Sequence, residues 1–474
     1  NRLAQALVAR GVRRGDRVAI YLPNAVEAVV AIFAALKADA VFVPVNRTTK
    51  AEKLLYVLNN CTAAALITDD RMPPNLGARL LQDVPSLRVL VVAGSATGAA
   101  LDDPRWLDFA GAQKEFAPRP PARRNIDTDL ACLIYTSGTT GEPKGVMSDH
   151  SNVVFASGSI ISYLGNVEDD IVLNVLPLSF DYGLYQVLMT FRFGGTLVLE
   201  NSFAYPAETL KRMVEERVTG FPGVPTIFAM LLNMDVSAFD LSRLRYVTNT
   251  AAALPPSHIT AIRQKFPGVT LFSMYGLTET KRTLYLPPEW LDRKPGSVGI
   301  PIPGTEAWVE DEQGRRLGPG QVGELVVRGR HVMRGYWGAP EATAARFRPG
   351  PIPGERVCYS GDLFRMDEEG CFYFVGRKDD IIKSRGEKVA PREVENVLHA
   401  LPGVVEAAVV GVPDPILGQS IKAVLVSRDP KLTANAVLAH CRAHLEDFMV
   451  PKLVEFRQTL PKSPSGKVRK EELL

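Results

Sequence analysis

The chain has 474 residues, 46% of them hydrophobic and 23% charged, which is the balance of a soluble globular protein with a large core. Its formal net charge of +3 is too small to indicate binding to nucleic acid or to a membrane surface. Five scattered cysteines without metal-ligand spacing exclude a disulfide framework and favour a reducing, cytoplasmic location.

The first half of the chain alternates apolar strands with amphipathic helices. A strand, a helix, a strand, a helix and a strand are expected at Arg17–Tyr21, Val26–Lys37, Val41–Val43, Ala51–Asn59 and Ala64–Thr68. The alternation returns at Ile171–Leu176, Leu184–Phe193, Thr196–Leu199 and Ala207–Arg217. It predicts parallel α/β sheets with crossover helices, while segment 102–128, rich in Pro, Arg and Asp, is expected to cross the surface.

No stretch of the sequence has the pattern of a membrane span. The most apolar window, Ala25–Val45, is interrupted by Glu27, Lys37 and Asp39. The first residues form an amphipathic helical pattern and not a signal-peptide pattern.

The pattern changes twice in the second half. From about residue 297, short strands at Thr305–Glu310, Gly323–Arg328 and Cys371–Val375 lie between Gly/Pro turns and predict a small β-barrel or distorted sheet. After residue 380 follow an expected helix, two strands, a helix and a strand at Pro391–Ala400, Val404–Val412, Ile421–Ser427, Ala434–Leu445 and Leu453–Phe456. We therefore predict a large domain over 1–378, α/β to about 296 and β-rich over 297–378, and a small α+β domain over 379–474.

Residues 135–145 read Tyr-Thr-Ser-Gly-Thr-Thr-Gly-Glu-Pro-Lys-Gly and are expected to link the strand Leu130–Ile134 to a helix that begins near Ser151. Glycines let a backbone approach a ligand closely, while the hydroxyls and one lysine suit an oligophosphate. The spacing is not that of a Walker A loop, because Gly145 follows Lys144. A polar surface loop is the alternative.

The order Thr-Ser-Gly-Thr-Thr-Gly-x-Pro-Lys-Gly resembles the phosphate loop of the adenylate-forming superfamily, which includes acyl-CoA synthetases, luciferases and the adenylation domains of nonribosomal peptide synthesis. Four further motifs resemble that family in the same order, so the resemblance extends over essentially the whole chain. It implies that the nucleotide phosphates are bound by Thr136, Ser137, Gly138, Thr139, Thr140, Gly141 and Lys144.

The motif Tyr275-Gly276-Leu277-Thr278-Glu279 follows an apolar strand. By the resemblance, Thr278 binds the α-phosphate and Glu279 holds Mg²⁺, an ion that prefers hard oxygen ligands and bridges phosphates. The alternative is an ordinary turn at the end of a strand.

Two more segments complete the nucleotide site that the resemblance implies. Asp362 is expected to accept both ribose hydroxyls, and Arg377 to contact the ribose or the phosphates. The small residues Ala251 and Ala252 are expected to contact adenine, and Tyr275 is expected to belong to the same nucleotide site. Taken alone, an Asp in a turn is usually a local backbone acceptor, and a run of alanines is usually core.

The resemblance also assigns three residues of the C-terminal part. Asp379 is expected to be the hinge about which the small domain rotates, and Gly386 to lie on the loop that faces the thiol. Lys467, after Ser465-Gly466, matches the lysine that bridges the carboxylate and the α-phosphate during adenylation. A solvated linker and an exposed terminal lysine are the alternatives.

The resemblance places the acyl pocket around Phe180, Asp181, Val247, Asn249, Met274 and Arg282. In amino-acid-activating relatives, an Asp after Phe at this place binds the α-ammonium of the substrate. Two ionisable residues, Asp181 and Arg282, favour a small polar or amino acid over a long fatty acid. The alternative is that these two residues pair with each other, because a buried charge requires a partner.

Together these motifs predict an AMP-forming acid–thiol ligase. It would use ATP and Mg²⁺ to form an acyl-adenylate, and would pass the acyl group to CoA or to the phosphopantetheine of a carrier protein. An oxidative luciferase-type enzyme and a nucleotide-binding sensor without catalysis are the alternatives.

Overall fold

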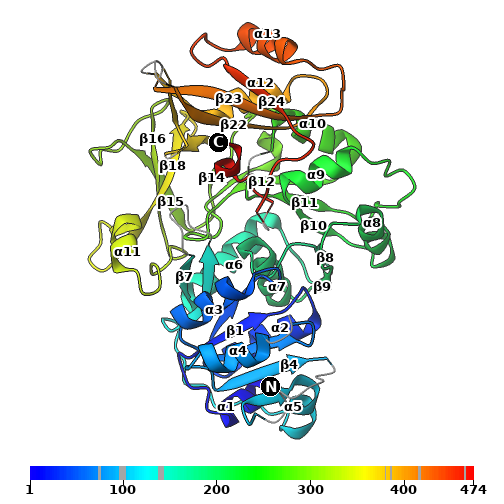
Figure 1. Cartoon of the computed structure of the whole chain (residues 1–474), viewed down its shortest axis with the longest axis vertical. Coiled ribbons are helices and arrows are strands. Elements are labelled where there is room, and N and C mark those ends of the chain that lie inside the picture. The colour runs from blue at the N-terminus through cyan, green and yellow to red at the C-terminus, as the bar shows by residue number, and fades with distance from the viewer. Residues whose placement is uncertain are drawn as a thin grey trace. The chain divides into compact units, whose positions relative to one another are not determined.

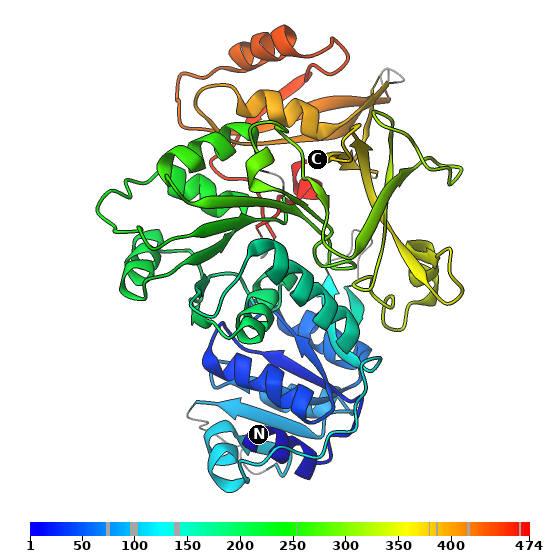
Figure 2. The same ribbon diagram turned by 180° about the vertical axis from the view of Figure 1, so that it is seen from behind.

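The computed structural model describes residues 1–72, 76–94, 103–136, 143–252, 254–378, 380–384, 387–414, 418–463 and 466–474 (Figures 1 and 2). These residues form two compact units to which several chain segments contribute. The first unit contains Asn1–Tyr205, Thr278–Lys281 and Arg328–Cys358. The second unit contains Pro206–Leu277, Arg282–Val327 and Tyr359–Leu474.

The first unit is built on a mostly parallel sheet. In spatial order its strands are β5 (Trp106–Asp108), β4 (Val89–Ala93), β3 (Ala63–Asp69), β1 (Arg17–Tyr21), β2 (Val41–Pro44), β6 (Leu130–Thr136) and β7 (Lys144–Asp149). Neighbouring strands run parallel except β7, which is antiparallel to β6. Every residue of β3 is buried, as expected for a strand that is covered on both faces.

Helices cover both faces of this sheet. Alternate residues of β3 enter two cores: Ile67 packs with α1 (Arg2–Ala9) and α2 (Val26–Lys37), and Leu66 packs with α3 (Ala51–Asn60) and α4 (Leu76–Asp83). The remaining elements of the unit are α5 (Phe109–Glu115), α6 (His150–Leu164), α7 (Asp181–Phe193), α11 (Pro340–Arg346), the parallel strands β8 (Ile171–Asn174) and β9 (Thr196–Leu199), and β17 (Phe347–Pro349).

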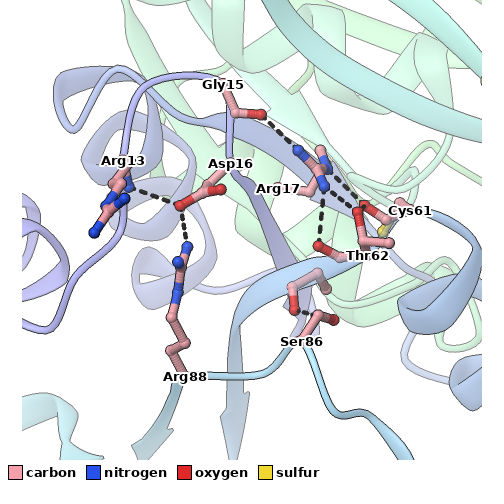
Figure 3. Close-up of polar contacts among 9 residues, drawn as sticks. Arg13, Gly15, Asp16, Arg17, Cys61, Thr62, Ser86 and Arg88 are labelled. Atoms are coloured by element: carbon pink, nitrogen blue, oxygen red, sulfur yellow. Dashed lines mark hydrogen bonds and ion pairs between the residues drawn. The ribbon is translucent and has the colours of Figure 1, made fainter.

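The Arg17 side chain caps the C-terminal end of α3 (Figure 3). Its guanidinium donates to the carbonyl oxygens of Cys61 and Gly15 and to the carbonyl and hydroxyl oxygens of Thr62. It also lies 5.0 Å from the ring centroid of Trp337. The last carbonyls of a helix lack intrahelical donors, so the cation satisfies them and complements the helix dipole.

The second unit begins with a parallel run of strands that ends in antiparallel pairs. In spatial order these strands are β14 (Ile300–Pro301), β13 (Leu284–Leu286), β12 (Thr270–Tyr275), β11 (Tyr246–Asn249) and β10 (Gly220–Gly223). Strands β10, β11 and β12 are parallel, and β13 is antiparallel to both β12 and β14. The helices of this part are α8 (Pro206–Glu215), α9 (Pro225–Leu232) and α10 (Pro256–Lys265).

An antiparallel region follows. Strand β15 (Thr305–Glu310) lies beside β16 (Val322–Gly329), which lies beside the long strand β18 (Arg356–Met366). Strand β19 (Phe372–Arg377) pairs with the later part of β18, and β17 pairs with its first residues.

The C-terminal residues of the second unit form an α+β arrangement. Its sheet has the order β21 (Glu387–Val389), β20 (Ile382–Ser384), β23 (Gly418–Ser427) and β22 (Val404–Asp414), and β24 (Leu453–Phe456) pairs in parallel with β23. Helices α12 (Pro391–His399) and α13 (Ala434–His444) pack against it and bury Val394, Leu398 and Val437 in one core.

The fold class expected from the sequence is confirmed: parallel α/β sheets come first, a β-rich region follows, and a small α+β part ends the chain. Three details differ. Segment 102–128 contains β5 and α5 instead of a plain surface crossing, Lys144–Asp149 forms a strand, and α7 begins at Asp181 and not at Leu184. Of the helices that the structure describes, none has the length and apolarity to cross a bilayer.

His331 makes the stability of the first unit depend on pH. Its ring is 0% exposed and stacks on Phe155 with centroids 5.7 Å apart, and burial lowers its pKa to about 3. The unfolded chain, with a His pKa of about 6.5, binds this proton more tightly than the folded chain. Above pH 6.5 His331 therefore does not lower the free energy of unfolding. As the pH falls from 6.5 toward 3, the free energy of unfolding decreases.

We expect the free energy of unfolding to fall by about 3 kcal/mol between pH 7 and pH 4 because of this one group, at ~1.4 kcal/mol for each unit of pH. Urea unfolding of wild type and His331→Gln across this range measures the effect, and the variant should show the smaller pH dependence. His444→Gln changes an exposed histidine and is the control. Equal pH dependence in wild type and His331→Gln contradicts the prediction.

Candidate active site

Thr136 and Lys144 lie opposite each other where β6 ends and β7 begins. The antiparallel register pairs the two residues, and the Thr136 hydroxyl donates to the Lys144 carbonyl at 3.5 Å. Five other predicted phosphate ligands, Ser137, Gly138, Thr139, Thr140 and Gly141, lie outside the described residues. The pairing of β6 with β7 thus brings together Thr136 and Lys144, the two described residues of the predicted motif.

Glu279 of the first unit is held by a tyrosine that the sequence analysis did not single out. The Tyr336 hydroxyl donates to Glu279 Oε1 at 2.6 Å, and the Lys144 ammonium lies 5.8 Å from the centroid of the Tyr336 ring. Tyr336 is aligned by a backbone bridge to Val146 of β7, and the carbonyl of Glu279 accepts from the Met333 N–H at 3.0 Å. A cation, a phenol and a carboxylate thus lie near one another in the first unit.

The Glu279–Tyr336 hydrogen bond has a fixed direction. Burial and the neighbouring Glu279 charge raise the pKa of Tyr336, so the phenol keeps its proton and donates it. A Gly-Tyr-Trp sequence usually indicates core packing, and nothing in it marked Tyr336 as a partner of the predicted metal ligand.

In the second unit, Asp362 and Arg377 come together with Tyr275. The Tyr275 hydroxyl donates to Asp362 Oδ2 at 2.6 Å, and Arg377 Nε lies 3.4 Å from Asp362 Oδ1. The ladder between β18 and β19 sets Asp362 directly opposite Arg377. The Tyr275 ring packs edge-on against Phe364, with centroids 4.9 Å apart. Three residues predicted separately for one nucleotide are therefore neighbours.

The predicted adenine segment follows β11 in a tight turn. Ala251 has φ +75°, a left-handed conformation that is uncommon for a residue with a side chain, and the Asn249 side-chain amide donates to the Ala252 carbonyl at 3.0 Å. Strands β11 and β12 are parallel, with Asn249 opposite Ser273. Their carboxyl ends, which carry Asn249 and Met274, therefore lie side by side, where open α/β sheets bind ligands, and Val247 lies two residues before Asn249 on β11.

Asp181 has a partner that the sequence analysis did not consider. The Lys281 ammonium lies 2.8 Å from Asp181 Oδ1, and the two side chains are 0% and 5% exposed. Phe180, the residue that caps α7, lies edge-on to Tyr182 with centroids 6.3 Å apart. Phe180 and Asp181 belong to the first unit, whereas Arg282, 4% exposed, belongs to the second.

The C-terminal Lys467 lies at the end of a narrow turn. A backbone bridge joins Lys462 and Val468, the Lys467 carbonyl accepts from the Ser463 N–H at 2.7 Å, and the Lys467 N–H donates to the Ser463 hydroxyl at 3.2 Å. The side chain of Lys467 is exposed. The predicted hinge residue Asp379 and the predicted thiol-loop residue Gly386 lie outside the described residues.

Two family models match the chain and together span most of it. One, for AMP-binding enzymes, matches residues 1–337, and the other, for the C-terminal domain of AMP-binding enzymes, matches residues 393–467.

Curated proteins and solved structures agree with this match. The chain is 34% identical to a long-chain-fatty-acid–CoA ligase of Bacillus subtilis (strain 168), over 100% of this chain and 88% of that protein. It is 36% identical to a feruloyl-CoA synthase of an Amycolatopsis species, over 100% of this chain and 91% of that protein. It superimposes on the O-succinylbenzoate coenzyme A synthetase of Bacillus subtilis in complex with ATP and magnesium ion with a TM-score of 0.84 and 29% identity, over 99% and 92% of the two chains.

The ordered motifs, the clustered site residues and these full-length likenesses agree, and the chain belongs to the AMP-binding enzyme family as an ATP-dependent, AMP-forming acid–thiol ligase.

Proposed function

We propose that this ligase converts a carboxylic acid and ATP to an acyl-adenylate and pyrophosphate, and then transfers the acyl group to the thiol of CoA with release of AMP. We choose CoA as the acceptor because the chain is similar over its whole length to a CoA ligase and a CoA synthase. A carboxylate is a poor acyl donor because its leaving group would be oxide, and the adenylate replaces this group with AMP.

Asp362, Tyr275 and Arg377 are proposed to hold the nucleoside. An ionised carboxylate accepts several hydrogen bonds, so Asp362 is able to accept from ribose hydroxyls while it accepts from Tyr275. Ala251 and Ala252, which have small side chains, would face the flat base. Tyr275–Leu277 runs directly into Thr278–Lys281, so the chain itself links the nucleoside residues to the phosphate residues.

The phosphates are proposed to bind Thr136, Lys144, Thr278 and the loop residues Ser137 to Gly141. The attack of one anion on another has to be offset by preorganised positive charge and donors, which is usually the largest contribution to catalysis. Lys144 supplies a cation at the end of β7, and the Thr136 and Thr278 hydroxyls supply donors.

Glu279 fits a magnesium ion by its chemistry. It offers carboxylate oxygens, which Mg²⁺ prefers, and among the described residues only Oε1 has a hydrogen-bond donor, which leaves Oε2 available as a ligand. When bound, the ion supplies positive charge that offsets the charge of the phosphates. A solved relative that contains ATP and magnesium supports this assignment.

Tyr336→Phe is expected to lower the rate of adenylation about tenfold and to raise the magnesium concentration needed for half-maximal rate several-fold. A hydrogen bond to a charged group contributes about 1.5–3 kcal/mol, and without it Glu279 loses its fixed position. Exchange of labelled pyrophosphate into ATP, titrated with magnesium, measures both quantities.

Tyr373→Phe removes another tyrosine–carboxylate bond, to Asp367 Oδ2 at 3.1 Å, and is the matched control. If Tyr336→Phe lowers the rate without changing the magnesium requirement, Tyr336 does not position a metal ligand.

Residues 379–474 are proposed to form a small domain that rotates about Asp379 between the two half-reactions. The separate family match over 393–467 and the separate core around Val394, Leu398 and Val437 support a domain of its own. In the first half-reaction Lys467 would reach the reacting carboxylate, and in the second Gly386 would lie along the path of the thiol.

The acyl pocket is proposed to draw on Phe180, Val247, Asn249, Met274 and Arg282. Asn249 is 0% exposed, and its Oδ1 has no hydrogen-bond donor among the described residues, so it is a candidate acceptor for a polar group of the acid.

All five cysteines are buried free thiols, which suits a reducing compartment, and we place the ligase in the cytoplasm.

A panel of aliphatic, aromatic, dicarboxylic and amino acids, tested in ATP–pyrophosphate exchange, checks the first half of this proposal. AMP release that depends on added CoA, compared with a phosphopantetheinylated carrier protein, checks the acceptor. The proposal expects exchange with at least one class and AMP release with CoA. A folded protein that binds ATP yet exchanges pyrophosphate with none of the acids would overturn it.

A further inference from the structure

The first unit contains an ion pair that is almost completely shielded from water. Lys281 Nζ lies 2.8 Å from Asp181 Oδ1, and Lys281 is among the largest fully buried side chains of the described residues. The ammonium also lies 5.7 Å from the centroid of the Tyr185 ring, one turn along α7 from Asp181, so an aromatic face adds to its environment. Removing two charges from water costs free energy, so a buried ion pair calls for a structural or functional explanation.

The Asp181 side of the pair is rigid. Asp181 is the first residue of α7, where the helix dipole favours a carboxylate. A side chain at Gly183 would come within 2.4 Å of the Pro177 carbonyl oxygen, so the helix start packs directly on the preceding turn. Asn24 donates to the Leu176 carbonyl at 2.9 Å and ties this turn to the first sheet. The backbone that carries Asp181 is therefore packed independently of Lys281.

The Lys281 side of the pair is strained. Lys281 has φ +59°, in the left-handed region that residues with side chains rarely adopt. Two residues earlier, the Glu279 carbonyl is held by the Met333 N–H at 3.0 Å. Unusual backbone conformations of this kind occur at sites where the surroundings impose them, often for function.

Lys281 is close along the chain to one of the residues assigned to the chemistry. Lys281 follows the proposed magnesium ligand Glu279 by two positions. Lys281 and Asp181 have opposite electrostatic effects on the pKa of Cys132, which burial raises, so both lie near this thiol of β6. Strand β6 ends at Thr136, the first residue of the proposed phosphate site.

We propose that Lys281 is a specificity-determining residue: its ammonium occupies Asp181 and excludes from the acyl site those acids that would place an ammonium there. This inference rests on the proposed function. The Lys281 ammonium takes the position beside Asp181 that the ammonium of an amino acid substrate would otherwise take. The enzyme then selects acids without an amine at this position, and removal of Lys281 opens a site for an alkylammonium between Asp181 and Tyr185.

The first test uses stability and does not require catalysis. Lys281→Met is expected to lower Tm by roughly 5–10 °C, because the loss of one partner leaves Asp181 without the charge that the structure pairs with it. Propylammonium chloride at 50 mM, compared with sodium chloride at the same concentration, should restore at least half of this loss. Wild type should gain less than 1 °C.

Two variants serve as controls. Lys281→Met combined with Asp181→Asn removes both charges, and its Tm should not respond to propylammonium. Lys294→Met removes the lysine of another ion pair, Lys294 Nζ to Asp367 Oδ2 at 2.8 Å in the second unit, and should not respond either. Lys281→Gln takes the place of Lys281→Met if the latter does not fold, and the same restoration is expected.

The second test uses pairs of acids that differ only in a terminal ammonium. In Lys281→Met, the ratio of kcat/KM for the amino acid to that for its amine-free partner should rise at least tenfold over wild type, and in the double variant it should not. An absence of restoration by propylammonium together with an unchanged ratio overturns the inference. A wild type that exchanges pyrophosphate with no acid would count against the proposed function, while the Tm experiment would still decide the role of Lys281.

Discussion

Lys467→Ala is expected to lower the rate of acyl-adenylate formation by about 10²–10³-fold, the usual effect of removing one preorganised electrostatic contact to a reacting group. Lys467 is exposed and stands at the end of the turn that Ser463 and the Lys462–Val468 bridge define. The variant therefore removes a charge without disturbing a core. ATP–pyrophosphate exchange measures the loss.

The same variant should still form the thioester from a supplied acyl-adenylate and CoA at close to the wild-type rate. The two half-reactions are proposed to use different faces of the small domain, and only the first uses Lys467. Lys431→Ala changes another exposed lysine of the C-terminal part and should affect neither step. If Lys467→Ala slows both half-reactions equally, Lys467 is not specific to adenylation.

Site residues that belong to recognisable sequence motifs could be predicted from the sequence. Asp362 and Tyr275 were each assigned to the nucleotide from separate motifs, and the structure joins them by a hydrogen bond of 2.6 Å. The parallel sheets could also be predicted, because an apolar run such as Ala63–Asp69 is typical of a strand that is covered on both faces.

Residues that act through tertiary contacts could not be predicted in this way. Lys281 lies in the polar sequence Thr-Glu-Thr-Lys-Arg, which reads as an exposed turn, and only the approach of α7 buries it beside Asp181. Tyr336 reads as core, yet its hydroxyl meets Glu279, 57 positions away. Strand β7 has an irregular mixture of polar and apolar residues, and it is stabilised by its antiparallel pairing with β6.

This difference has a consequence for the choice of substrate. From the sequence, Asp181 and Arg282 favoured a polar or amino acid, on the assumption that Asp181 meets the ammonium of the substrate. The structure gives Asp181 the ammonium of Lys281, so the same carboxylate becomes an argument against that class. The electrostatic role of a buried residue depends on its partner, which the motif alone does not contain.

Glu279→Gln is expected to lower adenylation by about 10²–10³-fold while it leaves the fold intact. The amide has the shape of the carboxylate and still accepts the Tyr336 hydrogen bond through its oxygen, but it lacks the charge that holds a divalent cation. The magnesium concentration for half-maximal exchange should rise at the same time, and more than it does in Tyr336→Phe, because the variant alters the proposed metal ligand itself and not its support.

Pyrophosphate exchange titrated with magnesium, at a fixed concentration of free ATP, measures both changes. Glu368→Gln, which neutralises an exposed carboxylate, is the control and should behave as wild type. Manganese binds oxygen sites more tightly than magnesium and should recover part of the lost rate in Glu279→Gln. If the variant keeps the wild-type magnesium requirement and manganese recovers nothing, Glu279 contributes to the site through its contact with Tyr336 and not as a ligand of the metal.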